Sequence, residues 1–203
     1  ALRGYPGCAF CPALSGSVAR EGGGDDPWRW WTAAQIADVC GTPQADGAIR
    51  ANWPLIYAAL VAAGGASRES CAAACATIAI ETANTWRPVE EAFWVPQPAR
   101  DAYYNDTTKH APYAGGGVKY HGRGYIQLTH DYNYARYGYA DNPEALLEPG
   151  PAADVFGRYW ASHGSATYAE AHDWRRCRGS VVGQVVNPPG WERLASIADM
   201  LLE

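Results

Sequence analysis

Three glutamates near the middle of the chain have the type and spacing of a catalytic acid and base. Glu81 follows the apolar run CAAACATIAI, and Glu90 and Glu91 come next, in the segment WRPVEEAFW. A carboxyl group among apolar side chains keeps its proton at neutral pH and can protonate a leaving-group oxygen. A second carboxylate across a cleft can take a proton from water, as in inverting glycosidases. The pattern alone leaves open the alternative that all three glutamates are solvated.

A second unusual stretch is YHGRGYIQLTH, at 120–130, which is followed by the aromatic-rich residues 131–139. Gly122 and Gly124 flank an arginine there, and glycine permits backbone conformations that are closed to residues with a Cβ atom. The chain also has nine Trp and thirteen Tyr, whose rings suit sugar binding, protein contacts and base stacking alike. The aromatic content therefore does not select a ligand.

The charge and hydropathy of the chain argue against two classes of partner. The formal net charge of −5 is unsuited to nucleic acid, which requires a basic surface, and to an anionic membrane. The longest apolar run, at 54–63, is shorter than the roughly 20 residues that span a bilayer. We expect no nucleic-acid partner and no membrane insertion. The N-terminus shows no signal peptide, and the start at Ala1 suggests an excised or processed domain.

Six cysteines and five histidines raise the question of a metal site. Cys8 and Cys11 have the spacing of zinc ligands, but no second C-x2-C and no suitable pair of histidines accompanies them. The alternatives are disulfides or buried free thiols, with the remaining cysteines at 40, 71, 75 and 177. Of the histidines, at 110, 121, 130, 163 and 172, we take His121 and His130 as candidates for a cleft lining. We expect no metal and no other cofactor.

The elements that must position these residues are mainly helices. Thr32 and Gln35 form a capping box for a helix that ends at Gly41. A second helix is predicted over 53–63, with Pro54 in its first turn. A third is predicted over 68–82, and its lack of a polar face indicates a central, buried position.

The remaining chain is predicted as a long irregular segment, at 84–119, followed by further helices. These helices are expected at 142–148, 151–164, 166–174 and 191–202, whereas 181–186 fits either a strand or a helix. Residues 1–31 are rich in Gly, Pro and Trp and are predicted to form an N-terminal extension. Residues 32–203 are predicted to form one mainly α domain.

Two segments resemble the core of the family 19 glycoside hydrolases, which include chitinases and related phage lysins. They are IAIETANTWRPVEEAFW, at 78–94, and YHGRGYIQLTHDYNYARYG, at 120–138. Weaker similarity extends over about 33–202. The resemblance implies a lysozyme-like, two-lobed α domain with a central buried helix and a loop-rich substrate cleft.

The resemblance also implies roles for individual residues. Glu81 matches the general acid. For the base, counting from Trp86 favours Glu91, whereas counting from Glu81 favours Glu90. Thr129 matches the residue that helps to hold the attacking water. Residues implied at sugar-binding positions are Gln127, Tyr132, Asn133, Tyr120, Arg123 and Asn187, of which Arg123 could instead be an ion-pair partner or structural.

The chain departs from the family pattern at two places. Ile80 precedes the acid where the family often has histidine, which implies more apolar surroundings for Glu81. In the segment VVNPPGWERL, Pro188 and Pro189 replace family glycines, which alters one wall of the cleft. Arg193, in the same segment, is a candidate to steady the second carboxylate.

The expected activity is inverting hydrolysis of a β-1,4 bond beside an N-acetylhexosamine. Both segments look more like actinobacterial or phage lysins than plant chitinases, so peptidoglycan is favoured over chitin. A lysin domain of this kind is expected to be made in the host cytoplasm without its own signal and to act on the cell wall. It would be one part of a larger chain, and its cysteines could oxidise only outside the cell. The altered VNPPG segment also motivates a catalytically silent wall-binding module.

Overall fold

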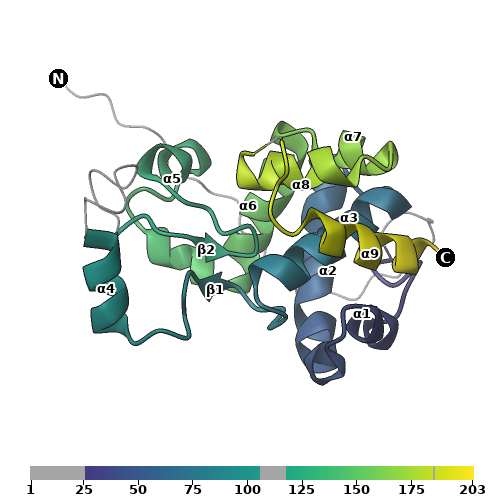
Figure 1. The fold of residues 1–203 in the computed structure, drawn as a ribbon, viewed down its shortest axis with the longest axis horizontal. Coiled ribbons are helices and arrows are strands. Elements are labelled where there is room, and N and C mark those ends of the chain that lie inside the picture. The colour runs from purple at the N-terminus through teal and green to yellow at the C-terminus, as the bar shows by residue number, and fades with distance from the viewer. Residues whose placement is uncertain (1–25, 106–117, 185) are drawn as a thin grey trace, which may run out of the picture.

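A computed structural model describes residues 26–105, 118–184 and 186–203, and the elements within these ranges are almost all helical (Figure 1). The mainly α prediction is confirmed. In chain order the elements are α1 (Ala33–Val39), η1 (Pro43–Ala45), α2 (Asp46–Ala62), α3 (Arg68–Glu81), β1 (Val89–Glu90), α4 (Gln97–Asn105), β2 (Arg123–Gly124), α5 (Asp131–Tyr137), η3 (Pro143–Leu147), α6 (Pro149–Ser162), α7 (Ser165–Glu170), α8 (Trp174–Val182) and α9 (Trp191–Leu202).

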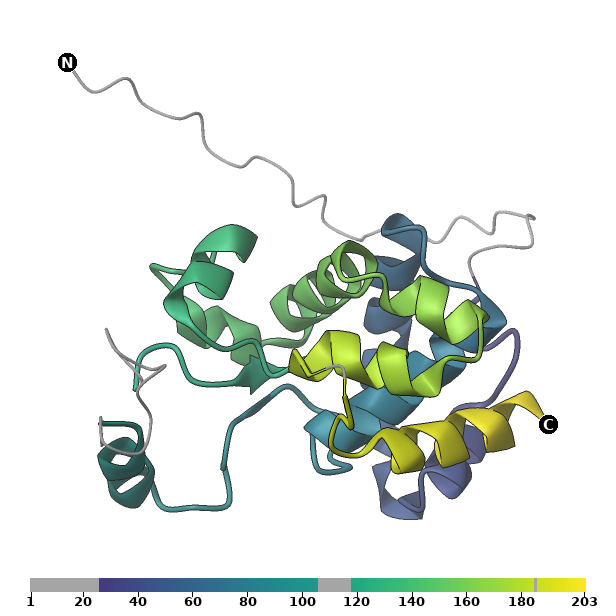
Figure 2. The same ribbon diagram turned by 45° about the horizontal axis from the view of Figure 1, so that its top comes forward.

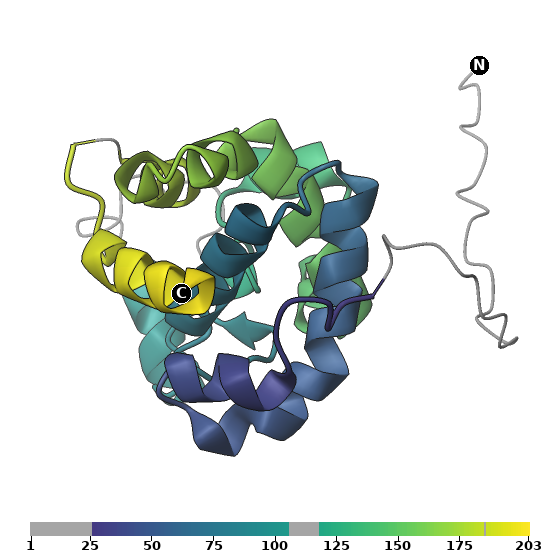
Figure 3. The same cartoon turned by 90° about the vertical axis from the view of Figure 1, so that its right-hand side faces the viewer.

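Helix α3 is the central element of the fold, as its sequence predicts. Ser67 caps its first turn by accepting a hydrogen bond from the Ser70 amide, and every residue of 70–79 is buried. Figure 3 shows α3 enclosed by α2, α8 and α9. Small Ala and Cys side chains let these neighbours approach closely, and dispersion forces then act over a large contact area. The helix therefore holds its C-terminal residue, Glu81, on a rigid support.

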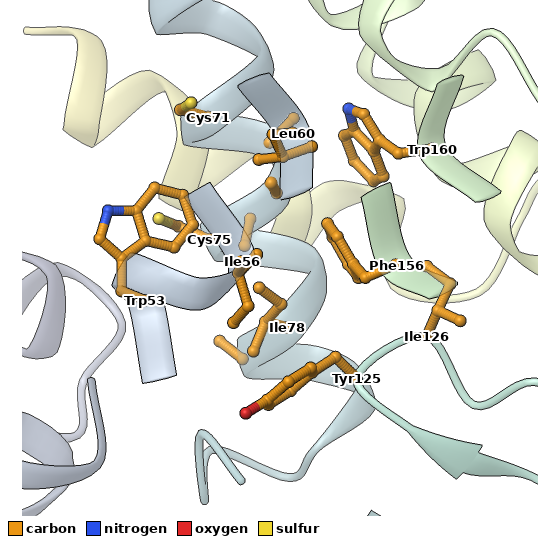
Figure 4. Close-up of a cluster of buried hydrophobic side chains, with 14 of the residues drawn as sticks. Trp53, Ile56, Leu60, Cys71, Cys75, Ile78, Tyr125, Ile126, Phe156 and Trp160 are labelled. Atoms are coloured by element: carbon orange, nitrogen blue, oxygen red, sulfur yellow. The ribbon is translucent and has the colours of Figure 1, made fainter. Parts of the chain in front are cut away.

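The core around α3 is built from large side chains of α2 and α6. Figure 4 shows Cys75 and Ile78 of α3 beside Trp53 and Ile56 of α2, with Phe156 of α6 nearby. All five side chains have exposed fractions of 1% or less. This packing seats one side of α3 against α2 and α6, which pack on each other, while α9 packs closely on α3.

The prediction that α2 begins near residue 53 is wrong, because α2 begins at Asp46 and contains Pro54 in its interior. Proline lacks a backbone N–H and breaks one helical hydrogen bond. The extra turns are stabilised by the Asp46–Arg50 pair, whose Oδ2 and Nε atoms are 2.7 Å apart, and by burial of Ile49. Asn52 also donates a hydrogen bond of 2.8 Å to the Trp86 carbonyl. Tertiary contacts therefore override the local signal for a helix start at Pro54.

The N-terminal part of the described chain packs against this helical body. The capping box of Thr32 and Gln35 is confirmed. Trp31, which the sequence groups with the extension, is only 7% exposed, and its indole N–H donates to the Leu201 carbonyl at 2.6 Å. The Trp53 indole donates to the Pro27 carbonyl at 2.8 Å. Residues 27–31 thus form part of the folded body, whereas 1–25 lie outside the described residues.

The segment predicted as irregular contains two elements that the sequence analysis missed. Strand β1 pairs antiparallel with β2, with Glu90 opposite Arg123, and α4 follows at Gln97–Asn105. The strands are two residues long, which is too short for an alternating pattern to be visible. Figure 2 shows α4 standing apart from the other helices. Residues 106–117 of this predicted segment lie outside the described residues.

The later helices follow the prediction with shifted boundaries. α6 and α9 lie where they were expected, while 142–148 forms the short 3-10 helix η3. The helix predicted over 166–174 corresponds to α7, which ends earlier, at Glu170, and α8 was not predicted apart from 181–182, its last two residues. Asp173 accounts for the start of α8 at Trp174, because its side chain caps the helix by accepting a hydrogen bond from the Arg176 amide.

Figure 1 shows an architecture of two lobes. We call β1, β2, α4 and α5 the hairpin lobe, and α1, α2, α3, α7, α8 and α9 the helical lobe; α6 and η3 join them. None of the helices in the described ranges is long and apolar enough to cross a bilayer.

Candidate active site

Glu81 lies at the last position of α3, and its side chain is 14% exposed. Its Oε1 atom forms an ion pair with Nη1 of Arg178 on α8. Arg178 is itself buried and donates from Nε to the Pro189 carbonyl at 2.8 Å. The expected apolar surroundings of Glu81 are therefore wrong, because a buried guanidinium contacts the carboxyl group.

The chain makes a tight turn directly after Glu81. Ala83, Asn84 and Trp86 all have positive φ angles, of 48°, 63° and 56°. Thr82 holds the turn, since its hydroxyl donates to the Ile78 carbonyl at 2.7 Å and accepts from the Trp86 amide at 3.1 Å. Left-handed conformations at non-glycine residues are strained and cluster at functional sites. This turn carries the chain from the helical lobe to strand β1.

Glu90 is held by buried side chains of Arg100 and His121. Its carboxylate lies 2.6 Å from Nη2 of Arg100, on α4, and 2.8 Å from Nε2 of His121. Arg123 is farther away, at 3.9 Å. His121 and Arg100 are 2% and 8% exposed. The network ties α4 to the hairpin.

Glu91 has a different environment from Glu90. Its amide donates to the Gly122 carbonyl at 2.7 Å, and its Oε2 accepts from the Gly122 amide at 3.2 Å. A Cβ atom at position 122 would lie 3.2 Å from this oxygen and 2.9 Å from Oε1 of Gln127. A side chain at 122 would therefore displace the Gln127 and Glu91 side chains, whereas Gly124 adopts a φ of 84°. The backbone, and no cation of the described residues, positions the Glu91 carboxylate.

Two adjoining hollows form a groove between the lobes. The larger, of about 530 Å³, extends past α5, α6 and α8, and the smaller, of about 280 Å³, extends along residues 89–94. Both are lined by Glu81, Gln127 and Thr129. Glu90 and Glu91 line the smaller hollow together with Glu81. The predicted acid and both candidates for the base thus face the same groove.

Gln127, Thr129 and Asn133 form a connected part of the groove floor. Gln127 has a φ of 52°, and its amide nitrogen donates at 3.0 Å to the carbonyls of both Val89 and Gly124. The Thr129 hydroxyl donates to the Gln127 carbonyl at 2.9 Å, and Asn133 donates to the Thr129 carbonyl at 2.8 Å. The Thr129 oxygen keeps its acceptor lone pairs, so a water bound there would donate to it.

Exposed aromatic rings lie at both ends of the groove. Tyr132 is 64% exposed and stacks on His130, with ring centroids 5.3 Å apart. At the other end, Trp94 is 69% exposed and Phe93 is 41% exposed. Flat exposed rings are suited to the apolar faces of sugars. The sequence analysis did not single out Phe93 and Trp94, although their place directly after Glu91 was visible.

Three predicted substrate-binding residues do not line the hollows of the described structure. Tyr120 donates its hydroxyl to the Ala140 carbonyl at 3.1 Å. Arg123 is 2% exposed and pairs with Glu144 at 2.7 Å, which is a structural position. Asn187 is exposed and accepts from the Trp191 indole at 3.3 Å.

Two further candidates also lie elsewhere. Arg193 donates to Asn84 at 2.9 Å and, among the described residues, pairs with neither candidate base. His121 is buried beneath the groove, whereas His130 lines it. Conversely, the structure adds Arg178, Arg136, Tyr159 and His163 to the groove, and no local motif marked these residues.

The four described cysteines, at 40, 71, 75 and 177, are buried free thiols. Burial raises the pKa of Cys40, Cys71 and Cys177 to about 12. Within the described ranges no group of three or more His, Cys, Asp or Glu side chains could hold a metal ion. Cys8, Cys11 and His110 lie outside these ranges.

Comparison with known proteins identifies a structural neighbour. No protein-family model matches the chain, and no curated protein matches it in sequence. Chitinase C from Streptomyces griseus HUT6037 matches in structure, with a TM-score of 0.51 and 18% sequence identity. The match covers 91% of this chain and 79% of that chain. The likeness supports the mainly α, lysozyme-like fold, and at this identity it shows the fold alone.

Proposed function

We propose that this chain is a glycoside hydrolase that cleaves a β-1,4 bond beside an N-acetylhexosamine with inversion. The observation that carries the proposal is the shared groove, in which Glu81 lies with Glu90, Glu91, Gln127 and Thr129. Two carboxylates, one on each lobe, can act on opposite faces of a sugar ring. The neighbouring chitinase adds support for a polysaccharide substrate.

Glu81 is the proposed general acid. Arg178 occupies one carboxyl oxygen, Oε1, so the other oxygen is the one that can carry and deliver the proton. When the proton moves to the glycosidic oxygen, Glu81 becomes a carboxylate, and Arg178 is already in place to stabilise that charge.

Glu91 is the proposed general base. Glu90 is engaged by Arg100 and His121, and these contacts leave its carboxylate poorly placed to accept a proton from water. The Glu91 carboxylate accepts one hydrogen bond, from Gly122, among the described residues. A water that donates one hydrogen to Glu91 and the other to the Thr129 hydroxyl would be oriented for attack.

The substrate that we favour is the glycan of bacterial peptidoglycan, with chitin as the alternative. Resemblance of the two sequence segments to lysins supports peptidoglycan, while the structural neighbour supports chitin. On this proposal the chain is a cell-wall-degrading domain of a larger phage lysin. It would be made in the host cytoplasm and would act on the wall.

The test uses Glu81→Gln, Glu91→Gln and the control Glu69→Gln, which removes a carboxylate from the opposite end of the same helix as Glu81. Purified peptidoglycan and chitin oligomers are the substrates, and mass spectrometry and NMR identify the new reducing end and its anomer. Loss of an acid or base lowers catalysis by about 10²–10⁴-fold, so both site variants should lose activity while the control keeps it. Wall lysis unchanged in Glu81→Gln would refute the mechanism.

If the chain is instead a wall-binding module without catalysis, we expect the opposite result. Wild-type protein would then release no reducing ends from either polymer but would still sediment with the wall. Release of inverted sugar ends by wild type, together with retained binding by Glu81→Gln, would exclude that alternative.

A further inference from the structure

The two ends of the groove differ in charge. The smaller hollow is lined by three carboxylates, Glu81, Glu90 and Glu91, and by Arg178, whereas the larger is lined by Arg136, by Glu81 and by the imidazole rings of His130 and His163. Glu81 is the one carboxylate among the residues that line the larger hollow, and Arg178 already pairs with it. The larger hollow is therefore the part of the groove that can attract a negatively charged group.

Arg136 is the main source of this positive charge. It lies in the last turn of α5 and is exposed to solvent. In the described part of the chain, no carboxylate lies within 4 Å of its guanidinium. The Arg136 side chain lies 5.9 Å from the Tyr137 ring, a contact that leaves its N–H groups available. An arginine in this state can form a bidentate pair with a carboxylate.

His163 and Tyr159 form the wall beside Arg136 in the larger hollow. Their rings stack with centroids 3.8 Å apart, and Nδ1 of His163 contacts the Tyr159 carbonyl at 2.9 Å. This hydrogen bond fixes the ring, and no described residue hydrogen-bonds to the opposite nitrogen, Nε2. The hollow thus combines a flat surface, suited to a sugar ring, with a guanidinium at its edge.

We infer that Arg136, supported by His130 and His163, forms a subsite for a carboxylate that is attached to the glycan. The inference rests on the proposed function and specifies its substrate. Chitin carries no charge, whereas peptidoglycan carries carboxylates on the lactyl groups or peptide stems of alternate sugars. The chain has a net charge of −5, so an anionic polymer needs a local cation to bind against the overall repulsion. Arg136 provides that cation beside the groove.

The test compares Arg136→Gln with Arg50→Gln, which changes the net charge equally but lies on α2, paired with Asp46. Three polymers are used: peptidoglycan with peptide stems, glycan strands from which an amidase has removed the stems to leave free lactyl carboxylates, and chitin oligomers. For each we measure kcat/KM and the Kd for binding at low and high salt. Arg136→Gln should weaken binding and turnover of a carboxylate-bearing polymer on the order of tenfold. Chitin should change by less than about twofold, because no ion pair is lost.

The outcomes separate the possible sources of the carboxylate. A loss on stem-bearing peptidoglycan alone assigns the contact to carboxylates of the stems, and a loss on the stem-free strands alone assigns it to the freed lactyl carboxylate. A loss on both anionic polymers shows that the subsite accepts either carboxylate. Arg136→Lys should restore part of the affinity, since lysine keeps the charge but not the bidentate geometry. An equal loss on chitin, or no loss on either anionic polymer, would overturn the inference.

The binding measurements also distinguish a failure of this inference from a failure of the proposed function. If wild type cleaves no polymer but Arg136→Gln still weakens binding of anionic strands selectively, the proposed function fails and the carboxylate subsite stands. If wild type cleaves peptidoglycan and Arg136→Gln binds and cleaves it like wild type, the subsite fails and the proposed function stands.

Discussion

The two lobes hold their carboxylates in different ways. Glu81 belongs to a helix whose residues 70–79 are all buried, so the packed core determines its position. Glu91 directly follows a strand of only two residues, and its position depends on individual hydrogen bonds to Gly122. A packed core resists small displacements, whereas a few hydrogen bonds tolerate them. We therefore expect changes in the residues that support Glu81 to affect mainly stability, and changes in the residues that position Glu91 to affect mainly activity.

The hairpin lobe compensates for its small size with buried charge. Glu90 joins Arg100 of α4 to His121, and Arg123 extends the contacts to Glu144. Such groups stabilise a structure only when their partners are all present, since an unpaired buried charge is costly. The lobe is thus held by interactions that depend on geometry and charge more than on apolar area.

The largest effect that we expect is on catalysis, from a change to Glu91 in the hairpin lobe. Glu91→Gln should lower kcat by about 10²–10⁴-fold, because the base is lost, and should leave the free energy of unfolding nearly unchanged. Glu90→Gln should keep most of the activity and lower stability, because it weakens the network with Arg100 and His121. Kinetics on soluble glycan and urea unfolding measure both quantities. The reverse assignment, with Glu90→Gln inactive and stable, would make Glu90 the base.

The next effect concerns the ion pair of the helical lobe. Arg178→Gln leaves the mostly buried Glu81 carboxylate without its partner, which costs about 3–5 kcal/mol of unfolding free energy for a buried pair. Arg178→Lys keeps the charge but loses the Nε contact to Pro189, and it should cost less. The control is Arg176→Gln, an exposed member of α8 paired with Asp173, for which about 0–1 kcal/mol is expected. If Arg178→Gln unfolds with the same urea midpoint as wild type, this account is contradicted.

The smallest effect tests the packing between α2 and α6. A Cβ atom on Gly157 would lie 2.5 Å from the Ala59 carbonyl oxygen, so Gly157→Ala forces the helices apart at a cost of about 1–3 kcal/mol. Gly47→Ala, in α2, places its Cβ in open space and should be neutral or slightly stabilising. Thermal unfolding of both variants measures the difference. Two equal melting temperatures would show that the contact between α2 and α6 adjusts more easily than we infer.

The helical lobe was largely predictable because its signals are local. The run CAAACATIAI has no polar face, so the burial of α3 follows from composition, and the capping box at Thr32 marks a helix start directly. The error at Pro54 has the same origin, because a proline signals a helix start locally, while the burial of Ile49 and Trp53 depends on tertiary contacts.

The hairpin lobe and the partners in the groove were harder to predict. Two-residue strands carry no periodicity, and α4 lies in a segment whose prolines suggest a loop. Arg178 is 97 positions from Glu81 in the chain, so no spacing rule connects them. The catalytic roles of Glu81, Glu91 and Thr129 remain predictions from the resemblance, and the structure shows only that the three line one groove.

The buried thiols have a consequence for the redox tolerance of the fold. The thiolate is the form that oxidises or reacts with electrophiles, and burial keeps Cys40, Cys71 and Cys177 protonated, with the pKa of each raised to about 12. The described part of the fold can therefore form in reducing surroundings and persist in oxidising ones without covalent change. An unfolded thiol ionises near 8.5, so this protection is complete below that pH and disappears as the pH rises through 12.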